Sequence, residues 1–267
     1  MALILALTTA IPGFIIGARQ STGEEAGAAS AAEESFPAPT GKWAITDGNL
    51  GWYLEKGGDG REEGTVFTIS TAQDLVALAV LVNHRTKAIY YDGTTKNILS
   101  VGTAPADMSG VNCLNDQSDT TVRAMAGCTV QLGDDIDLEG KEFTPIGLWG
   151  SSFQGTFDGQ THTVSNLYET ASSSNDSSRF YMGFFGNLAG DDAVAKDFSL
   201  KNVVLDFEIP ATNNGLRLAP VCGMVQGKAS VSDVTVEDVH MRILWKPGAS
   251  TTALVCGGIF GEIQSPT

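Results

Sequence analysis

A short glycine-containing pattern recurs three times in the second half of the chain. It occurs as GFFG at Gly183–Gly186, as GMVQ at Gly223–Gln226 and as GIFG at Gly258–Gly261, with spacings of 40 and then 35 residues. Repeats of this length cannot each bury a core, whereas stacked copies form a continuous one. The recurrence therefore predicts a layered, repetitive fold.

A second pattern repeats between these glycine markers. Asp197–Leu200 corresponds to Asp233–Val236, and an earlier, partial copy is placed at Asn166–Leu167. In the two full copies the alternating apolar residues continue: Val203, Leu205 and Phe207 match Val239, Met241 and Ile243. Alternation of this kind is typical of strands with one buried face.

Stacking of the copies places equivalent side chains above one another. The sequence predicts two apolar ladders, made of Leu167, Phe198 and Val234 and of Phe185, Val225 and Phe260, and a polar corner ladder of Asn166, Asp197 and Asp233.

The N-terminal region carries no repeat. Residues 2–18 are uncharged and end in small residues before Arg19, so residues 1–20 are predicted to be a signal peptide, cleaved after Ala18, or an N-terminal anchor. Seventeen apolar residues interrupted by Pro12 and Gly13 are marginal for crossing a bilayer. Residues 21–40, rich in Ala, Glu, Ser and Pro, are predicted to be a disordered spacer.

Residues 41–130 are predicted to form an α+β cap region with one helix. A strand at 65–69 leads into a helix near 71–83, for which Ser70 and Gln73 are the expected capping pair. A further strand is expected at 88–91, and residues 103–120 form an irregular excursion with no functional interpretation.

Charge limits the partners. The chain has 31 acidic and 16 basic residues and a net charge of −15, so nucleic acid and anionic membranes are repelled over most of its surface. No membrane contact is expected beyond the possible N-terminal anchor. The 42% hydrophobic content is enough for a sizeable core.

The four cysteines do not have zinc-site spacing, and the chain has only three histidines. In an exported protein Cys113 with Cys128 could close a loop, and Cys222 with Cys256 could bridge neighbouring layers. Four cysteines allow three pairings, and free buried thiols are an equal alternative for the second pair.

Several motifs resemble a known family. DIDL at 135–138, TPIG at 144–147, FDGQTH at 157–162 and GFFGNL at 183–188 resemble the GLUG-motif repeat proteins of bacterial surfaces. The segment 68–83 also resembles the stretch that often precedes such repeats, and the similarity covers about 200 residues. The chain departs from the pattern at Gln226, Gln160 and Thr161.

The resemblance implies a right-handed parallel β-helix, or solenoid, in large exported proteins that include adhesins and the non-catalytic part of some immunoglobulin A metallopeptidases. It implies no shared catalytic residues. Residues 131–267 are then the GLUG-like β-solenoid repeats, expected to be incomplete at the C-terminus.

Candidate chemistry is sparse. Asp135 and Asp137 would share one face of a strand, close enough to bind Ca²⁺, but the apolar residues between them favour outward-facing acids on a half-buried strand. Other candidates are Asp134, Asp191 and Asp192, the histidines His84, His162 and His240, and the aromatic residues Trp149, Tyr168, Tyr181 and Trp245, which could stack on sugar rings. His162 is expected to make a structural hydrogen bond, and His84 to contact the last carbonyls of its helix.

From these observations we expect no catalytic, cofactor-binding or metal-ligating residues, and no cofactor. The predicted function is a non-enzymatic, exported cell-surface module of the adhesin type that contacts host glycan, matrix or protein. The alternatives are a carbohydrate-active lyase or hydrolase on a β-helix and a non-catalytic spacer of a large exported metallopeptidase.

Overall fold

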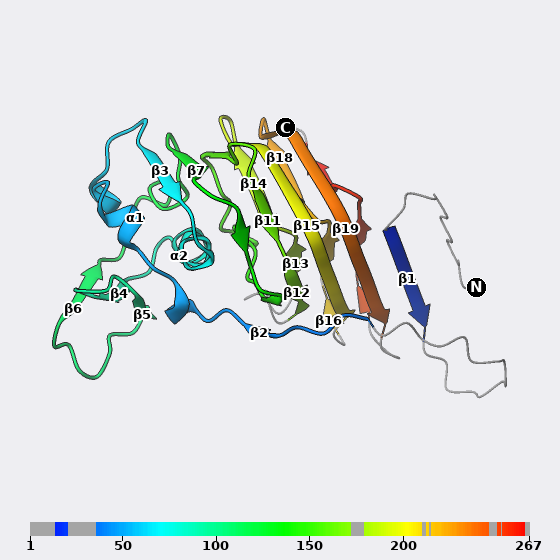
Figure 1. The fold of residues 1–267 in the computed structure, drawn as a ribbon, viewed down its shortest axis with the longest axis horizontal. Helices are drawn as coiled ribbons and strands as arrows, with labels where there is room; N and C mark the ends of the chain where they lie inside the picture. Colours follow the sequence, from blue (N-terminus) through cyan, green and yellow to red (C-terminus); the bar gives the residue numbers. More distant parts are fainter. Residues whose placement is uncertain are drawn as a thin grey trace.

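Parallel sheets form most of the molecule, which confirms the predicted mainly β fold (Figure 1). The computed structural model describes residues 14–20, 36–171, 179–209, 212–213, 215–245, 250–251 and 253–264. Before residue 128 the strands are β1 (Phe14–Gln20), β2 (Gly41–Lys42), β3 (Val66–Ile69), β4 (Ile89–Asp92), β5 (Ile98–Val101) and β6 (Val111–Leu114). The helices are α1 (Gly51–Leu54) and α2 (Ala72–Asn83), with short 3-10 turns η1 (Ile45–Asp47) and η2 (Gly58–Gly60).

The remaining strands belong to the repeated part. They are β7 (Thr129–Leu132), β8 (Ile136–Asp137), β9 (Lys141–Glu142), β10 (Thr156–Asp158), β11 (Thr163–Ser165), β12 (Tyr168–Thr170), β13 (Arg179–Met182), β14 (Phe185–Gly190), β15 (Val194–Ile209), β16 (Thr212–Asn213), β17 (Gly215–Leu218), β18 (Cys222–Gly227), β19 (Ser230–Trp245), β20 (Ser250–Thr251), β21 (Leu254–Cys256) and β22 (Phe260–Gln264).

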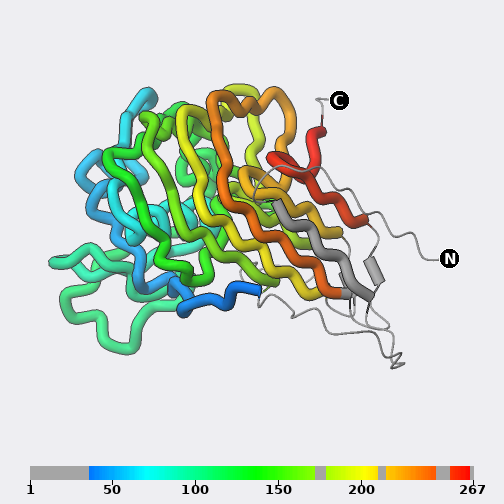
Figure 2. Tube along the Cα trace, turned by 45° about the vertical axis from the view of Figure 1, so that its right-hand side comes forward, coloured from blue at the N-terminus to red at the C-terminus, as the bar shows by residue number. Residues whose placement is uncertain are grey.

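Successive segments of this part stack as parallel layers. β15 pairs with β19 from Val194 opposite Ser230 to Ile209 opposite Trp245, an offset of 36 residues. In the layer before, β11 pairs with the same offset, since Val164 lies opposite Leu200, whereas β10 pairs at an offset of 38, with Thr156 opposite Val194. Figure 2 shows the layers side by side, from green through yellow to orange. The predicted match of Val203, Leu205 and Phe207 with Val239, Met241 and Ile243 is confirmed.

Residues with left-handed backbone form two corners in each layer. At one corner these residues are Thr161, Asp197 and Asp233, and at the other Asn166, Asn202 and Asp238, with φ between 52° and 67°. Asparagine and aspartate tolerate this conformation because their short polar side chains bond locally. Nδ2 of Asn202 donates to Oδ1 of Asn166 at 2.5 Å, so equivalent corner side chains also bind each other between layers.

Two corners with similar residues explain one wrong prediction. The ladder partners Asp197 with Asp233 and Phe198 with Val234 hold, but Asn166 and Leu167 do not belong with them. Because Val164 lies opposite Leu200, Asn166 lies beside Asn202 and Leu167 beside Val203. A polar residue followed by an apolar one occurs at both corners, so this pattern alone does not distinguish them.

The predicted ladder of Phe185, Val225 and Phe260 is wrong at its middle member. Phe185 lies opposite Cys222, which lies opposite Phe260, whereas Val225 lies opposite Leu188. The equivalent glycines are therefore Gly186, Gly223 and Gly261. A Cβ atom at Gly186 would lie 2.1 Å from the Gly147 carbonyl oxygen, and one at Gly261 would lie 2.4 Å from that of Gly223, so backbone contact between layers requires glycine there.

Helix α2 packs against the first layers, and its apolar side chains join the same core (Figure 1). The helix lies where the sequence predicts it, but its N-cap is one residue later than expected. Thr71 Oγ1 accepts from the Asp74 amide, and the Asp74 carboxylate accepts in return from the Thr71 amide. Both amides at the helix start are thereby satisfied, in the pattern of a capping box.

The excursion after α2 is more regular than expected. β4 pairs antiparallel with β5 and with β6, and β6 lies inside the stretch 103–120 that was predicted to be irregular. Asp92 forms a turn at the end of β4, since its Oδ1 accepts from the Thr94 and Thr95 amides.

The chain before the repeats runs along their edge. Thr40 donates its amide to the Gly140 carbonyl at 2.9 Å, and the Tyr168 hydroxyl donates to the Pro37 carbonyl at 3.0 Å. Residues 1–13 of the predicted signal and residues 21–35 of the predicted spacer lie outside the described residues. β1, between them, pairs in parallel with β19. Among the described residues no helix is long and apolar enough to span a bilayer.

All four cysteines are free thiols, so neither suggested disulfide is formed. The buried Cys222 lies opposite Phe185 and Phe260, whereas Cys256 lies on another sheet opposite Leu218. Burial raises the pKa of Cys222 to about 12, so this thiol is protonated at neutral pH.

One acidic residue, Glu169, occupies a position in an otherwise apolar ladder. Glu169 lies opposite Leu205, which lies opposite Met241, and the glutamate is fully buried. Its Oε2 accepts from the Gly183 amide at 2.8 Å, while Oε1 has no hydrogen-bond partner. Burial raises the pKa of Glu169 to about 8. The folded protein therefore holds this carboxyl protonated at neutral pH.

The Glu169→Gln variant tests this burial. Between the ordinary pKa of 4.5 and the folded value of about 8, the folded state binds more protons than the unfolded state, so the group's contribution to stability falls as pH rises. We expect the difference in melting temperature, variant minus wild type, to increase from pH 5 to pH 8. The exposed Glu237→Gln variant is the control. A difference that is constant with pH would contradict the assignment.

Engineered cysteines test the 36-residue register. Oγ of Ser199 lies 2.6 Å from Oγ1 of Thr235 on the exposed face. Adjacent strands lie about 4.8 Å apart, within disulfide reach, so Ser199→Cys with Thr235→Cys should crosslink on mild oxidation. Ser199→Cys with Glu237→Cys, displaced by two residues, should not. Peptide mapping by mass spectrometry distinguishes the new bond from bonds to native thiols, and equal crosslinking of both pairs would reject this register.

Candidate functional site

Asp135 and His162 form a surface pair at a turn. Oδ1 of Asp135 lies 3.1 Å from Nδ1 of His162 and accepts from the Thr163 amide at 2.8 Å. The Thr163 amide, and then His162, lower the pKa of the Asp135 carboxyl. An acid for glycoside cleavage needs the opposite shift. The geometry fits a turn-stabilising hydrogen bond, which is the role expected for His162.

The other acidic candidates also have local partners. Asp137 Oδ1 accepts from Nδ2 of Asn166 and from the Glu139 amide, each at 2.7 Å. Asp191 pairs with Lys228 at 2.8 Å on the surface. Across the described ranges, no three His, Cys, Asp or Glu side chains gather in a way that could hold a metal ion. The remaining candidates add no metal site within the described ranges. Asp134 accepts a hydrogen bond from the Asp135 amide, Asp192 is exposed, and His240 is half-buried on β19.

Of the candidate aromatic residues, only Trp149 is shown to be exposed. Its exposed fraction is 45%, whereas Tyr168 and Tyr181 are 3% and 2% exposed. Sugar stacking by these two tyrosines is therefore excluded. The side chain of Trp245 lies outside the described residues.

Trp149 forms a wall of an open hollow at the C-terminal end of α2. The hollow has a volume of about 310 Å³. It is lined by Asn83, His84, Arg85, Thr86 and Lys87 after the helix, by Thr120 of the excursion, and by Leu148, Trp149, Gly150 and Ser151 of the first layers. The site thus joins three segments that are distant in sequence.

Arg85 supplies an incompletely bonded cation to this hollow. Its Nη2 donates to the Gly150 carbonyl at 2.7 Å, but Nη1 is buried without a hydrogen-bond partner. Burial lowers the pKa of Arg85, although a guanidinium remains charged at neutral pH. Lys87, two residues on, is exposed. None of the described lining residues is acidic, so the hollow favours an anion.

Asn83, the last residue of α2, adds an unpaired acceptor. Its Nδ2 donates to the Pro145 carbonyl at 2.9 Å, while the buried Oδ1 has no partner. Next to it, burial and the charge of Lys87 lower the pKa of His84, so this imidazole is neutral at pH 7. His84 is the C-cap of the helix, and its backbone amide donates to the Val80 carbonyl; the contact of its side chain with the last carbonyls stays a prediction. The hollow therefore offers both donors and an acceptor.

Trp149 is held by two neighbours. The Arg179 guanidinium lies 3.9 Å from the centre of its ring, and Tyr181 contacts it edge-on at 5.6 Å. The indole is thus fixed in place by packing while nearly half of its surface remains open. An exposed, held aromatic ring is suited to stacking against a ligand.

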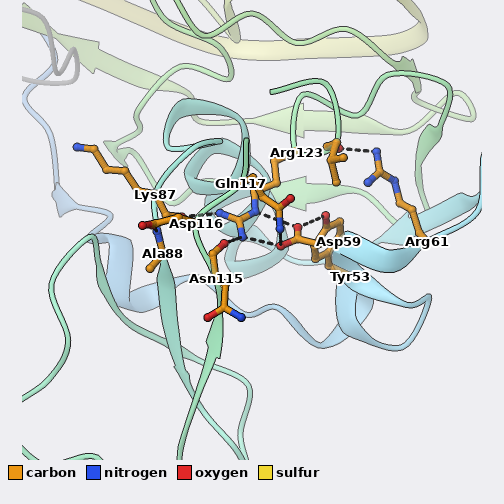
Figure 3. Close-up of polar contacts among 10 residues, drawn as sticks. Tyr53, Asp59, Arg61, Lys87, Ala88, Asn115, Asp116, Gln117 and Arg123 are labelled. Atoms are coloured by element: carbon orange, nitrogen blue, oxygen red, sulfur yellow. Dashed lines mark hydrogen bonds and ion pairs between the residues drawn. The ribbon is translucent and has the colours of Figure 1, made fainter. Parts of the chain in front are cut away.

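A buried ion pair holds the segment that lines the hollow (Figure 3). Arg123 is fully buried and makes two bonds to Asp59, from Nε at 2.9 Å and from Nη2 at 2.5 Å. Asp59 also accepts from the Tyr53 hydroxyl at 2.8 Å and from Gln117 at 2.9 Å. Burial and the Asp59 charge raise the pKa of Tyr53, which therefore stays neutral.

The same network reaches the cationic segment directly. Arg123 donates to the Lys87 carbonyl at 2.5 Å, and Asp116 accepts from the Ala88 amide at 2.5 Å, as Figure 3 shows. The Gln117 amide also donates to the Thr86 carbonyl at 3.2 Å. The excursion therefore positions Thr86 and Lys87, which line the hollow.

Sequence reasoning identified Trp149 and His84 but not this site. Arg85, Lys87 and Asn83 lie in a helix end without a recognisable motif, and their relation to Trp149 depends on contacts between residues about 65 positions apart. The only sequence signal for this site was the pair of basic residues Arg85 and Lys87, which stand out in an acidic chain.

Replacement of Arg123 should destabilise the cap region. Arg123→Met leaves the Asp59 carboxylate, whose side chain is 13% exposed, without its counter-ion. Breaking a buried pair typically costs about 3–5 kcal/mol of unfolding free energy, and this is an upper bound here because Asp59 keeps its bonds from Tyr53 and Gln117. Chemical denaturation measures this loss, and hydrogen exchange should show faster exchange of the Ala88 and Gln117 amides. Lys56→Gln, on the exposed surface, is the control. A loss below about 1 kcal/mol would show that the pair carries little of the stability.

Comparison with protein-family models, with curated proteins and with solved structures finds no match for the chain. The GLUG-like motifs therefore remain a resemblance.

Proposed function

We propose that the chain is a non-enzymatic, exported cell-surface module of the adhesin type, built as a right-handed β-solenoid, whose surface binds host glycan, matrix or protein. The observation that carries this proposal is the 36-residue offset between β15 and β19, which recurs where β11 and β12 pair with β15. Stacked layers of this kind form elongated scaffolds that present a large surface rather than one closed catalytic cleft.

The distribution of polar groups supports a binding role. The candidate acids Asp135 and Asp137 are engaged in turns, and the residues that line the hollow beside Trp149 include one unpaired donor, on Arg85, and one unpaired acceptor, on Asn83. Unpaired polar groups beside an aromatic wall are the usual composition of a small-ligand site. The function therefore rests on recognition at this hollow and along the layered surface.

A binding and cleavage assay tests the proposal. Purified protein is applied to arrayed host glycans and to immobilised collagen and fibronectin, and in parallel it is incubated with pectate, alginate and hyaluronan. We expect saturable retention on at least one surface and no shortened polysaccharide. Asp135→Asn and Asp137→Asn should bind like the wild type.

Two results would overturn the proposal. Polysaccharide cleavage by the wild type that both variants lack would support the enzyme alternative. Absence of retention on every surface would remove the binding function and favour the spacer alternative.

A further inference from the structure

We propose that the hollow at the end of α2 binds a carboxylate-bearing sugar residue of an acidic glycan. This inference rests on the proposed binding function and specifies its ligand. Four residues carry it: Asn83, Arg85, Lys87 and Trp149.

The first argument is local charge. The chain has a net charge of −15, yet the hollow is lined by Arg85 and Lys87, and its described lining contains no Asp or Glu. Arg179 is not one of the lining residues, but its guanidinium lies 3.9 Å from the centre of the Trp149 ring, next to the hollow. An anionic group is therefore attracted to the hollow in spite of the negative net charge of the chain.

The second argument is hydrogen bonding. Arg85 and Asn83 both line the hollow, and each carries one covered polar atom, Nη1 of Arg85 and Oδ1 of Asn83, without a hydrogen-bond partner. A polar group without a partner is costly, so a ligand gains from each of these contacts when the two side chains turn toward it. A carboxylate accepts from the guanidinium, and a neighbouring hydroxyl donates to the amide oxygen. A sugar acid carries both groups, whereas acetate has no hydroxyl to donate.

The third argument is the wall of the hollow. Trp149 is 45% exposed and is held between Arg179 and Tyr181, so its position does not depend on the ligand. A flat aromatic surface packs against the C–H face of a pyranose ring. The volume of about 310 Å³ lies at the lower end of the range for small-ligand sites, which suits one sugar residue of a chain.

Rigid positioning completes the site. The Lys87 carbonyl is held by Arg123, the Arg85 side chain by the Gly150 carbonyl, and the Asn83 side chain by the Pro145 carbonyl. These bonds fix the polar groups before a ligand arrives, which lowers the entropic cost of binding.

Direct titration tests the inference. Glucuronic acid, galacturonic acid and N-acetylneuraminic acid are titrated into the full chain and followed by ligand-observed NMR and calorimetry, with glucose, acetate and inorganic phosphate as comparison probes. We expect saturable binding of at least one sugar acid, weaker binding at high salt, and binding at least roughly tenfold weaker for every comparison probe.

Variants assign the contact residues. Arg85→Gln and Lys87→Gln should each weaken sugar-acid binding roughly tenfold or more, and Trp149→Ala should do the same. Lys201→Gln, an exposed lysine on the layered surface, is the matched control and should bind like the wild type. Because Arg85 also bonds the Gly150 carbonyl, the exposed Lys87 provides a test that does not depend on that contact, and melting temperatures confirm folding.

The outcomes separate this inference from the proposed function. Equal binding of acetate or phosphate would reduce the site to a simple anion site, and equal binding of glucose would remove the role of the carboxylate. Unchanged sugar-acid binding by Lys87→Gln and Trp149→Ala together would overturn the assignment. If no sugar acid binds but the chain is retained on the arrayed glycans or matrix proteins, only this inference fails; if nothing is retained either, the proposed function fails as well.

Discussion

The C-terminal layers of the molecule depend on backbone pairing between residues 36 to 38 positions apart: 36 between β15 and β19, 37 between β14 and β18, and 38 between β18 and β22. Each layer uses its neighbours to satisfy its amides and carbonyls, and in doing so it places Phe198 against Val234 and Leu200 against Val236. A shift of one residue would turn every apolar ladder outward, so the register of the strands also determines which side chains form the core. The aromatic contacts inside, such as Phe157 with Phe184 and with Phe198, at 5.4 Å and 5.5 Å, follow from it.

This constraint explains which parts of the fold could be predicted from the sequence. The match between β15 and β19 was predicted correctly because the apolar positions of one strand recur 36 residues later in the other, from Phe198 with Val234 to Phe207 with Ile243. The glycine markers were misaligned because GFFG contains two glycines, and only close backbone contact identifies Gly186 as the one equivalent to Gly223. Local patterns therefore predict that a repeat exists, whereas its register needs the contacts between layers.

In the cap region too, local sequence patterns predict the helix but not the long-range contacts that form the candidate site. Helix α2 was predicted from its apolar residues and capping signals, both of which are local. The bonds from Arg123 to Asp59 and to the Lys87 carbonyl join positions 64 and 36 residues apart, and no periodic pattern marks them. A buried arginine of this kind is costly unless fully bonded, so the excursion had to fold around it.

The contrast between the layers and their end accounts for the position of the site. Within the layers, many polar side chains meet an equivalent residue and bond to it, as Ser199 does with Thr235 and Gln226 with Gln264. Glu169 and Asn187 are exceptions, since each has a buried oxygen without a hydrogen-bond partner, but both residues are enclosed in the layers and inaccessible to a ligand. Where α2 meets the first layers the repeat stops, so the side chains of Asn83 and Arg85 have no equivalent residue to bond. Unsatisfied groups that border an open hollow are thus a consequence of ending a stack, and this end is where a layered protein of this kind can acquire a specific ligand.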